Sequence, residues 1–301
     1  MATGKSIDIS IAFDESPYLN PQIKLFADTM KEQILEESVL HVVTNRDVKD
    51  ESLVYLLNRI PNHEVYFKET FQGLISRCKY LIHSVDVDSD ADYLLKMDLD
   101  VIPLKSLDSL YEILDGSDVY IQMENRRVIP DDVMEKRIWR QVYKAMEFKV
   151  PDIKMSYVEN TEIGFPLFNT GVFLLRTSKL KQASENWSKL TKVCENWIQF
   201  NLHPNEAALT AMIFNYHWKL NMLPKRFNFN PISTFRKGEF PSTELKEDCK
   251  IPEDTVLLHY HKAKWLRHLM RYNKGLDDKL KGLNYLESLW NTPEEVYREK
   301  V

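Results

Sequence analysis

Two aspartates interrupt one of the most apolar stretches of the 301-residue sequence. Asp98 and Asp100 stand in YLLKMDLDVI, residues 93 to 102, whose other side chains mostly suit a buried strand. A buried carboxylate without a counter-charge destabilises the fold or takes up a proton. Two carboxylates one residue apart can share a hard divalent cation such as Mn²⁺ or Mg²⁺, and strand alternation points both the same way. The stretch therefore predicts a metal site, although the same spacing also arises by chance.

A pair of histidines near the end of the chain has the same spacing. His259 and His261 belong to LLHYHKAKW, residues 257 to 265, and strand alternation again predicts that they share a face. Imidazole is a suitable further ligand for manganese. The alternative for either residue is a core histidine that hydrogen-bonds to the backbone.

Strand-like and helix-like segments alternate in the first half of the chain and must position these residues. Segments rich in Val, Ile and Tyr predict strands at 6–13, 39–45, 63–69, 92–102 and 118–124. Apolar residues at three- and four-residue spacing predict helices at 20–37, 50–60, 71–85 and 106–114. The alternation predicts an α/β fold with a parallel sheet, whose ligands bind at the carboxyl ends of the strands. Asp14, Asp98 and Asp100 should therefore lie at one rim.

The second half of the chain is less regular. Its pattern predicts helices at 131–147, 179–200 and 205–216, and strands at 171–176 and 255–261. No internal repeat, GxGxxG motif or P-loop occurs, so the sequence does not support a dinucleotide or ATP site of those kinds.

Composition excludes several classes of protein. A net charge of -5 argues against nucleic acid as a partner. The sequence contains no apolar run of membrane-spanning length and no signal-peptide core in residues 1 to 16, so we expect a cytoplasmic protein. Its three cysteines are widely spaced and fit reduced thiols.

Four motifs together resemble a known family. YLLKMDLDVIPLKSLDSL, FNTGVFLLRTSKL, NEAALT and LLHYHKAKW follow in the order and approximate spacing of GT-A glycosyltransferases. They look most like family 8, the group of glycogenin and the bacterial lipopolysaccharide galactosyltransferases. The resemblance, over residues 7 to 265, implies one Rossmann-like domain with a mostly parallel mixed sheet. It also implies manganese-dependent transfer from a UDP-sugar with retention of configuration.

We accordingly expect a single GT-A domain at residues 1–265, followed by a helical tail at 266–301 packed on it. The nucleotide-binding half would span about 1–125 and the acceptor and catalytic half about 126–265. The resemblance leaves the acceptor open among a glycan, a lipid-linked sugar and a protein.

The resemblance also implies roles for single residues. Asp98 and Asp100 match the metal-binding aspartates, with Asp98 also near the donor ribose, and His259 matches the histidine that completes the site. The other matches concern the donor and the reacting sugar: Ala12, Phe13 and Asp14 in the nucleotide-binding turn, Tyr18 against the base, Arg77 reaching the donor, Asn169 in the sugar pocket, Glu206 beside the anomeric carbon, and Lys264 at the diphosphate.

The sequence departs from the family pattern at two places. HYHKAKW lacks the glycine and proline of the family's HxxGxxKPW and is one residue shorter, so Lys262 is the alternative diphosphate contact. The common DQD is replaced by Asn205, Glu206 and Ala207. A carboxylate there could act as a general base in an inverting enzyme, or as a nucleophile or charge stabiliser in a retaining one. Glu206 could also be a helix-start acid favoured by the helix dipole.

Three other classes of protein share parts of this pattern. A haloacid-dehalogenase-like phosphatase would carry its DxD on the first strand and continue it with Gly-Thr, whereas Val101 and Ile102 follow here. A sugar nucleotidyltransferase would show a glycine-rich basic loop in place of FDESPYLNP. A degenerate GT-A binding scaffold fits the missing glycine, but the presence of Asp98, Asp100 and Lys264 argues against it.

The segment from 261 to 281 is basic, with seven Lys or Arg against two Asp. A solvated basic helix is one interpretation. The other is contact with an anionic acceptor or a membrane surface, in which Trp265, Leu269 and Tyr272 form an apolar edge beside Arg267 and Arg271. Gly275 should interrupt the helix.

Overall fold

The computed structural model describes residues 5–69, 81–124, 129, 131–156, 163–200, 203–231, 250–261 and 263–291. Arg77 and Lys262, two of the expected donor contacts, lie outside these residues. So does most of the expected helix at 71–85, of which a 3₁₀ turn, η3 (Leu81–Val85), is described.

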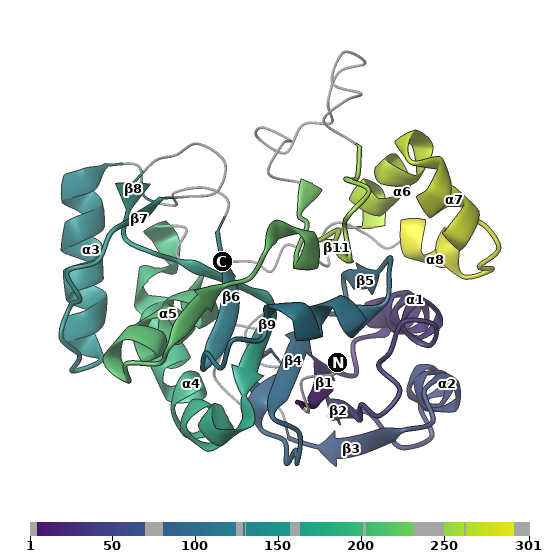
Figure 1. The fold of residues 1–301 in the computed structure, drawn as a ribbon, viewed down its shortest axis with the longest axis horizontal. Coiled ribbons are helices and arrows are strands. Elements are labelled where there is room, and N and C mark those ends of the chain that lie inside the picture. The colour runs from purple at the N-terminus through teal and green to yellow at the C-terminus, as the bar shows by residue number, and fades with distance from the viewer. Residues whose placement is uncertain are drawn as a thin grey trace.

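A seven-stranded sheet in the order β10-β6-β9-β4-β1-β2-β3 forms the centre of the molecule (Figure 1). β1 pairs in parallel with β2 and β4, β2 with β3, and β6 with β10, whereas β9 runs antiparallel between β4 and β6. The expected α/β fold with a mostly parallel mixed sheet is therefore confirmed. The strands are β1 (Ile7–Phe13), β2 (Leu40–Thr44), β3 (His63–Phe67), β4 (Tyr93–Met97), β6 (Val119–Met123), β9 (Phe168–Arg176) and β10 (Leu220–Met222).

Helices cover both faces of this sheet because successive strand residues point to opposite faces. On β4, Leu94 packs into a core with helices α3, α4 and α5, whereas Leu95 packs into a second core with α1 and α2. Figure 1 shows these two groups of helices on opposite sides of the molecule. The helices are α1 (Asn20–Met30), α2 (Glu51–Arg59), α3 (Asp132–Ala145), α4 (Leu180–Cys194) and α5 (Pro204–Asn215).

Several boundaries differ from the sequence prediction. Asp50 and Asp131 cap α2 and α3 as expected for helix starts. The first helix ends at Met30, and the segment expected as a helix at 106–114 is the 3₁₀ helix η4 (Leu107–Ile113). The long helix expected at 179–200 is α4 followed by η6 (Glu195–Phe200). Smaller 3₁₀ turns are η1 (Pro17–Leu19), η5 (Thr177–Lys179) and η7 (Lys225–Phe227).

The strand expected at 92–102 is two strands. β4 ends at Met97, and β5 (Val101–Pro103) leaves the central sheet to pair antiparallel with β11 (Leu257–His259). The amide of Val101 donates to the carbonyl of Asp98 at 3.1 Å, which closes the turn between them. Asp98 and Asp100 therefore lie in a turn, so the prediction that strand alternation points them the same way was wrong. A short hairpin of β7 (Met155–Ser156) and β8 (Ile163–Gly164) completes the strands.

The C-terminal segment forms α6 (Ala263–Tyr272), α7 (Lys274–Leu280) and α8 (Leu286–Trp290). These helices share a third core with Leu25 of α1 and Leu258 of β11. Trp265 and Leu269 are 3% and 0% exposed, and Leu269 belongs to that core, so the expected apolar edge at these positions was wrong. The break between α6 and α7 falls at Asn273, before Gly275. None of the described helices is long and apolar enough to span a bilayer.

Candidate active site

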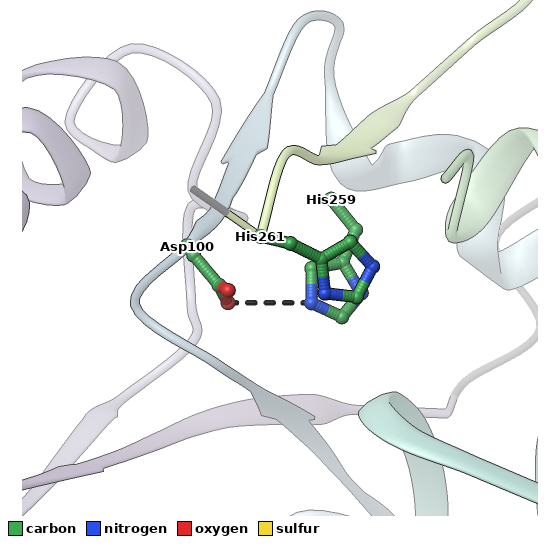
Figure 2. A group of neighbouring side chains, drawn as sticks. All are labelled: Asp100, His259 and His261. Carbon is green, nitrogen blue, oxygen red and sulfur yellow. Dashed lines mark ion pairs between the residues drawn. The ribbon is translucent and has the colours of Figure 1, made fainter. Parts of the chain in front are cut away.

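Three side chains with metal-binding groups meet where β5 and β11 pair. Asp100, His259 and His261 each offer one ligand atom, and these atoms lie within 4.8 Å of one another (Figure 2). His261 lies beyond the end of β11 with a φ of 57°, so a turn, and not strand alternation, places it beside His259. The two imidazole rings stack with centroids 3.8 Å apart. One carboxylate oxygen and two imidazole nitrogens form a donor set that fits Mn²⁺.

Charge is already balanced within this cluster. Nε2 of His259 lies 3.3 Å from Oδ1 of Asp100. Although burial opposes the charged form, the charge of His259 and its hydrogen bond lower the pKa of Asp100 to about 2. Burial also opposes protonation of His259, but Asp100 raises the pKa of this imidazole above its usual value. A cation that binds Nε2 would therefore compete with a proton whose binding Asp100 favours.

An asparagine fixes the orientation of His259. Nδ1 of His259 lies 3.1 Å from Oδ1 of Asn228, and the amide Nδ2 of Asn228 donates to Oδ1 of Asn169 at 2.9 Å. An amide oxygen only accepts, so Nδ1 carries the hydrogen and Nε2 faces Asp100. Such outer partners set the tautomer of a metal-binding histidine. The sequence analysis did not identify Asn228, because no local pattern distinguishes it.

Gly171 leaves the space that the His259 ring occupies. A Cβ at this position would clash with Cε1 of His259 and lie 2.7 Å from its Nδ1. The amide of Gly171 donates to Oδ1 of Asn169 at 3.0 Å, so the same glycine also orients that side chain. The segment that the sequence assigned to the sugar pocket thus packs directly against a candidate metal ligand.

We expect Asn228→Ala to weaken manganese binding by about 10- to 100-fold, because His259 loses the acceptor that fixes its tautomer. Asn228→Asp keeps an oxygen at the same place and should retain most of the affinity. Calorimetric titration of both variants with MnCl₂ measures the difference. An equal loss in the two variants would mean that Asn228 acts through packing or through its donation to Asn169, and not through Nδ1 of His259.

Asp98 has a different counter-charge, one that the sequence analysis missed. Lys96 is fully buried; its Nζ pairs with Oδ1 of Asp98 and donates to the carbonyl of Thr170 at 2.6 Å. Burial raises the pKa of Asp98, and the charge of Lys96 opposes that shift. A lysine in the middle of YLLKM was the available signal, because a lysine in a buried strand needs a partner.

The carboxyl groups of Glu206 and Glu124 lie together, close enough to Asp98 for its charge to act on Glu206. Glu206 stands in the first turn of α5, is 8% exposed, and its Oε2 has no hydrogen-bond partner among the described residues. Burial, then the charge of Glu124 and a hydrogen bond to it, raise the pKa of Glu206 well above its ordinary range. Glu124 follows β6 and accepts from Nδ2 of Asn169 at 2.6 Å. The raised pKa of Glu206 favours its neutral form next to a second carboxyl group, an arrangement suited to proton transfer and hydrogen bonding.

These surroundings argue against the alternative in which Glu206 is a helix-start acid. A helix-start acid that stabilises α5 through the helix dipole has to be charged, whereas the surroundings of Glu206 favour the neutral form. Asn169 joins the two parts of the site, because its Oδ1 accepts from Asn228 and its Nδ2 donates to Glu124. Glu124 lies 82 positions before Glu206 in the sequence, and no motif pointed to it.

The expected nucleotide-binding turn follows β1, which is next to β4 in the sheet. Oδ1 of Asp14 accepts from the amide of Ser16 at 2.8 Å. Arg46, which is 2% exposed, donates to the carbonyls of Asp14 and Ser16 at 2.6 and 2.7 Å and so holds the turn from beneath. Ala12 and Phe13 are buried, so they can offer a ligand little beyond their backbone.

The remaining expected donor contacts lie apart from one another. Tyr18 is half-buried in η1. Lys264 stands in the first turn of α6, with Nζ 5.7 Å from the centre of the Trp265 ring. The structure therefore brings together Asp98, Asp100, His259, Asn169 and Glu206. Lys264 follows His259 closely in the sequence but stands on α6.

No family model and no curated protein sequence matches the chain. Solved structures do match. The galactosyltransferase LgtC, crystallised with donor and acceptor sugar analogs, is 17% identical, with a TM-score of 0.57 over 96% of this chain and 99% of that chain. Mouse xyloside xylosyltransferase 1 is 13% identical, with a TM-score of 0.52 over 85% of this chain and 97% of that one. The glycosyltransferase GlyE of Streptococcus pneumoniae TIGR4 is 15% identical, with a TM-score of 0.52 over 95% and 64%.

The chain thus has the α/β fold of these glycosyltransferases, the GT-A fold. At such low sequence identity the likeness concerns the fold, and the activity has to be argued from the site.

Proposed function

We propose that the protein is a glycosyltransferase that moves a sugar from a nucleoside diphosphate sugar, UDP-linked, to an acceptor hydroxyl with the help of a divalent cation. The observation that carries this proposal is the meeting of Asp100, His259 and His261 beside the end of β4, in a fold shared with glycosyltransferases. In open α/β sheets, ligands bind at this end of the strands. The similarity to family 8 belongs to the same proposal.

The residues of the site would bind different parts of the donor and its metal ion. Asp100, His259 and His261 would hold Mn²⁺ or Mg²⁺, which when bound offsets the negative charge of a departing diphosphate. Lys96 keeps Asp98 in place at the edge of this cluster. Lys264 would contact the diphosphate from α6, and Asp14 with Tyr18 would contact the nucleoside.

Glu206 supports the retaining outcome over the inverting one. A neutral carboxylic acid is neither a base nor a nucleophile, but it donates a hydrogen bond as the amide of a glutamine does. Glu206 would therefore hydrogen-bond at the reacting sugar, beside the carboxyl group of Glu124. An inverting transferase or a sugar nucleotidyltransferase is the alternative, and NMR analysis of the product anomer separates the first of these from retention.

A panel of nucleotide sugars with manganese tests the proposal without knowledge of the acceptor. We expect slow hydrolysis of one UDP-sugar by the wild-type protein and none by Asp100→Asn, because the variant lacks a candidate metal ligand. Metal-dependent binding of UDP-sugars with no hydrolysis or transfer of any would support a binding scaffold instead. The acceptor, whether a glycan, a lipid-linked sugar or a protein, and the cytoplasmic location remain part of the proposal.

Glu206→Gln should gain stability relative to the wild type as the pH rises. Burial and Glu124 raise the folded-state pKa of Glu206 above its ordinary value of 4.5. The stability that this proton contributes is therefore complete below pH 4.5 and is lost as the pH rises toward the folded-state pKa, by up to about 1.4 kcal/mol per pH unit. Glutamine has no such proton to lose.

Thermal melts from about pH 4.5 to 8 measure this difference. Glu185→Gln, at an exposed position on α4, is the matched control and should follow the wild type throughout. Parallel stability profiles for the wild type and Glu206→Gln would show that Glu206 is charged in the folded protein.

A further inference from the structure

A basic hollow of about 320 Å³ lies between α6 and α8. Its lining consists of Lys264, Arg267, His268 and Arg271 of α6 and Trp290 of α8. Each of the four residues of α6 lies three or four positions from two of the others, so they share one side of the helix. Figure 1 shows α6 and α8 side by side at the end of the molecule formed by the C-terminal helices. We call this feature the α6–α8 hollow.

The hollow gathers positive charge from α6. Arg267 and Arg271 are exposed, and neither forms an ion pair with a carboxylate in the described part of the chain. The sequence has 45 acidic residues against 40 Lys and Arg, so acids are not scarce. Like charges four residues apart destabilise a helix. The arrangement thus opposes the stability of α6 and fits a site for an external anion.

The neighbouring groups also suit an anion with an apolar part. Burial, and then the charge of Arg271, lower the pKa of His268, so its imidazole is neutral at pH 7 and adds a polar group without further charge. Trp290 is half-buried and forms the wall that belongs to α8. Its indole offers an apolar surface beside the two guanidinium groups.

A discrete ligand fits the hollow better than a membrane surface does. The large apolar side chains of α6, Trp265 and Leu269, are both buried, so they do not reach a bilayer. A surface-bound helix needs such residues on its outer face. The basic residues here line a concavity instead.

We propose that the α6–α8 hollow binds a phosphate group that is attached to an apolar moiety. Arg267 and Arg271 bind the phosphate oxygens, since guanidinium groups form paired charge-assisted hydrogen bonds with phosphate. Trp290 contacts the apolar part. In the proposed sugar transfer, on which this last step rests, the ligand is a phosphate-bearing acceptor and not the donor.

The test is calorimetric titration with n-octyl phosphate in the absence of metal and nucleotide. Arg267→Gln/Arg271→Gln should weaken binding by roughly tenfold or more, because two charged hydrogen-bond donors are lost. Lys274→Gln/Lys281→Gln removes the same charge from exposed residues outside the hollow and should stay within about twofold of the wild type. Trp290→Leu should weaken binding of n-octyl phosphate and leave binding of inorganic phosphate unchanged.

Three outcomes would overturn the proposal. Wild-type protein that does not bind n-octyl phosphate, or binds it as well after the double arginine substitution, removes the phosphate site. Binding only to phosphatidylglycerol-containing vesicles, reduced equally by both double variants, indicates a membrane surface. Weaker binding of UDP with manganese in Arg267→Gln/Arg271→Gln assigns the hollow to the donor. Since the titration contains neither donor nor metal, its result is independent of the nucleotide-sugar panel.

Discussion

Asp100→Asn should abolish manganese-dependent binding of UDP and leave the fold intact. Asp100 is the one carboxylate among the three candidate ligands, and it faces Nε2 of His259 at 3.3 Å. Replacing a residue that only orients a ligand costs about 10- to 100-fold in metal affinity, so losing the ligand itself should cost more than about 100-fold. Calorimetric titration with UDP and MnCl₂ measures the loss.

The matched control is Asp278→Asn, which removes an exposed carboxylate of α7 that pairs with Lys281. It should bind UDP and manganese as the wild type does. In the wild type, manganese affinity should still rise as the pH increases above 6.5, the ordinary pKa of a histidine, because Asp100 raises the pKa of His259 and Nε2 must lose its proton to bind. Undiminished affinity in Asp100→Asn would remove this residue from the metal site.

Lys96→Met should destabilise the protein by about 3–5 kcal/mol, since it leaves the carboxylate of Asp98 without its counter-charge. Lys96 is fully buried, and its other contact is the carbonyl of Thr170 at 2.6 Å. The methionine side chain is similar in length and shape to the aliphatic part of lysine, so lost packing contributes little to the change. Urea unfolding at constant pH measures the change.

The double variant Lys96→Met/Asp98→Asn separates the charge from the packing. Because asparagine carries no charge, the double variant should recover much of the stability that Lys96→Met loses. Asp98→Asn alone, which leaves the ammonium group unpaired, should also be less stable than the double variant. Additive losses in this cycle would mean that the Lys96–Asp98 pair makes no energetic contribution.

Much of the fold followed from local patterns. The Val- and Ile-rich segments at 6–13, 39–45 and 118–124 became β1, β2 and β6 within one or two residues. Side-chain periodicity encodes which face of a segment is buried, so it can be read without knowing the partner. The segment at 92–102 shows where this fails. A run of apolar residues does not reveal that β5 leaves the sheet to pair with β11. In that pairing Pro103 lies opposite Leu257, which is 154 positions later in the sequence.

Part of the candidate site could also be predicted from local sequence composition. Asp98, Asp100 and His259 stand in short segments whose composition is unusual for buried strands. Lys96 carried an equally visible signal, a charge within an apolar strand. Asn228 and Glu124 carried none, because asparagine and glutamate are ordinary in loops and at strand ends. Their importance comes from contacts with His259 and Asn169.

The sequence by itself determined the order of strands and helices and the positions at which carboxylates follow buried strands. The tertiary structure alone decided the partners. The antiparallel insertion of β9 between β4 and β6 places the carbonyl of Thr170 against Lys96, and the start of α5 places Glu206 beside Glu124. A titratable group acquires its charge state from the groups that are desolvated with it. Those groups come from distant parts of the chain, so the raised pKa of Glu206 and the pairing of Asp100 with His259 exist only in the folded protein.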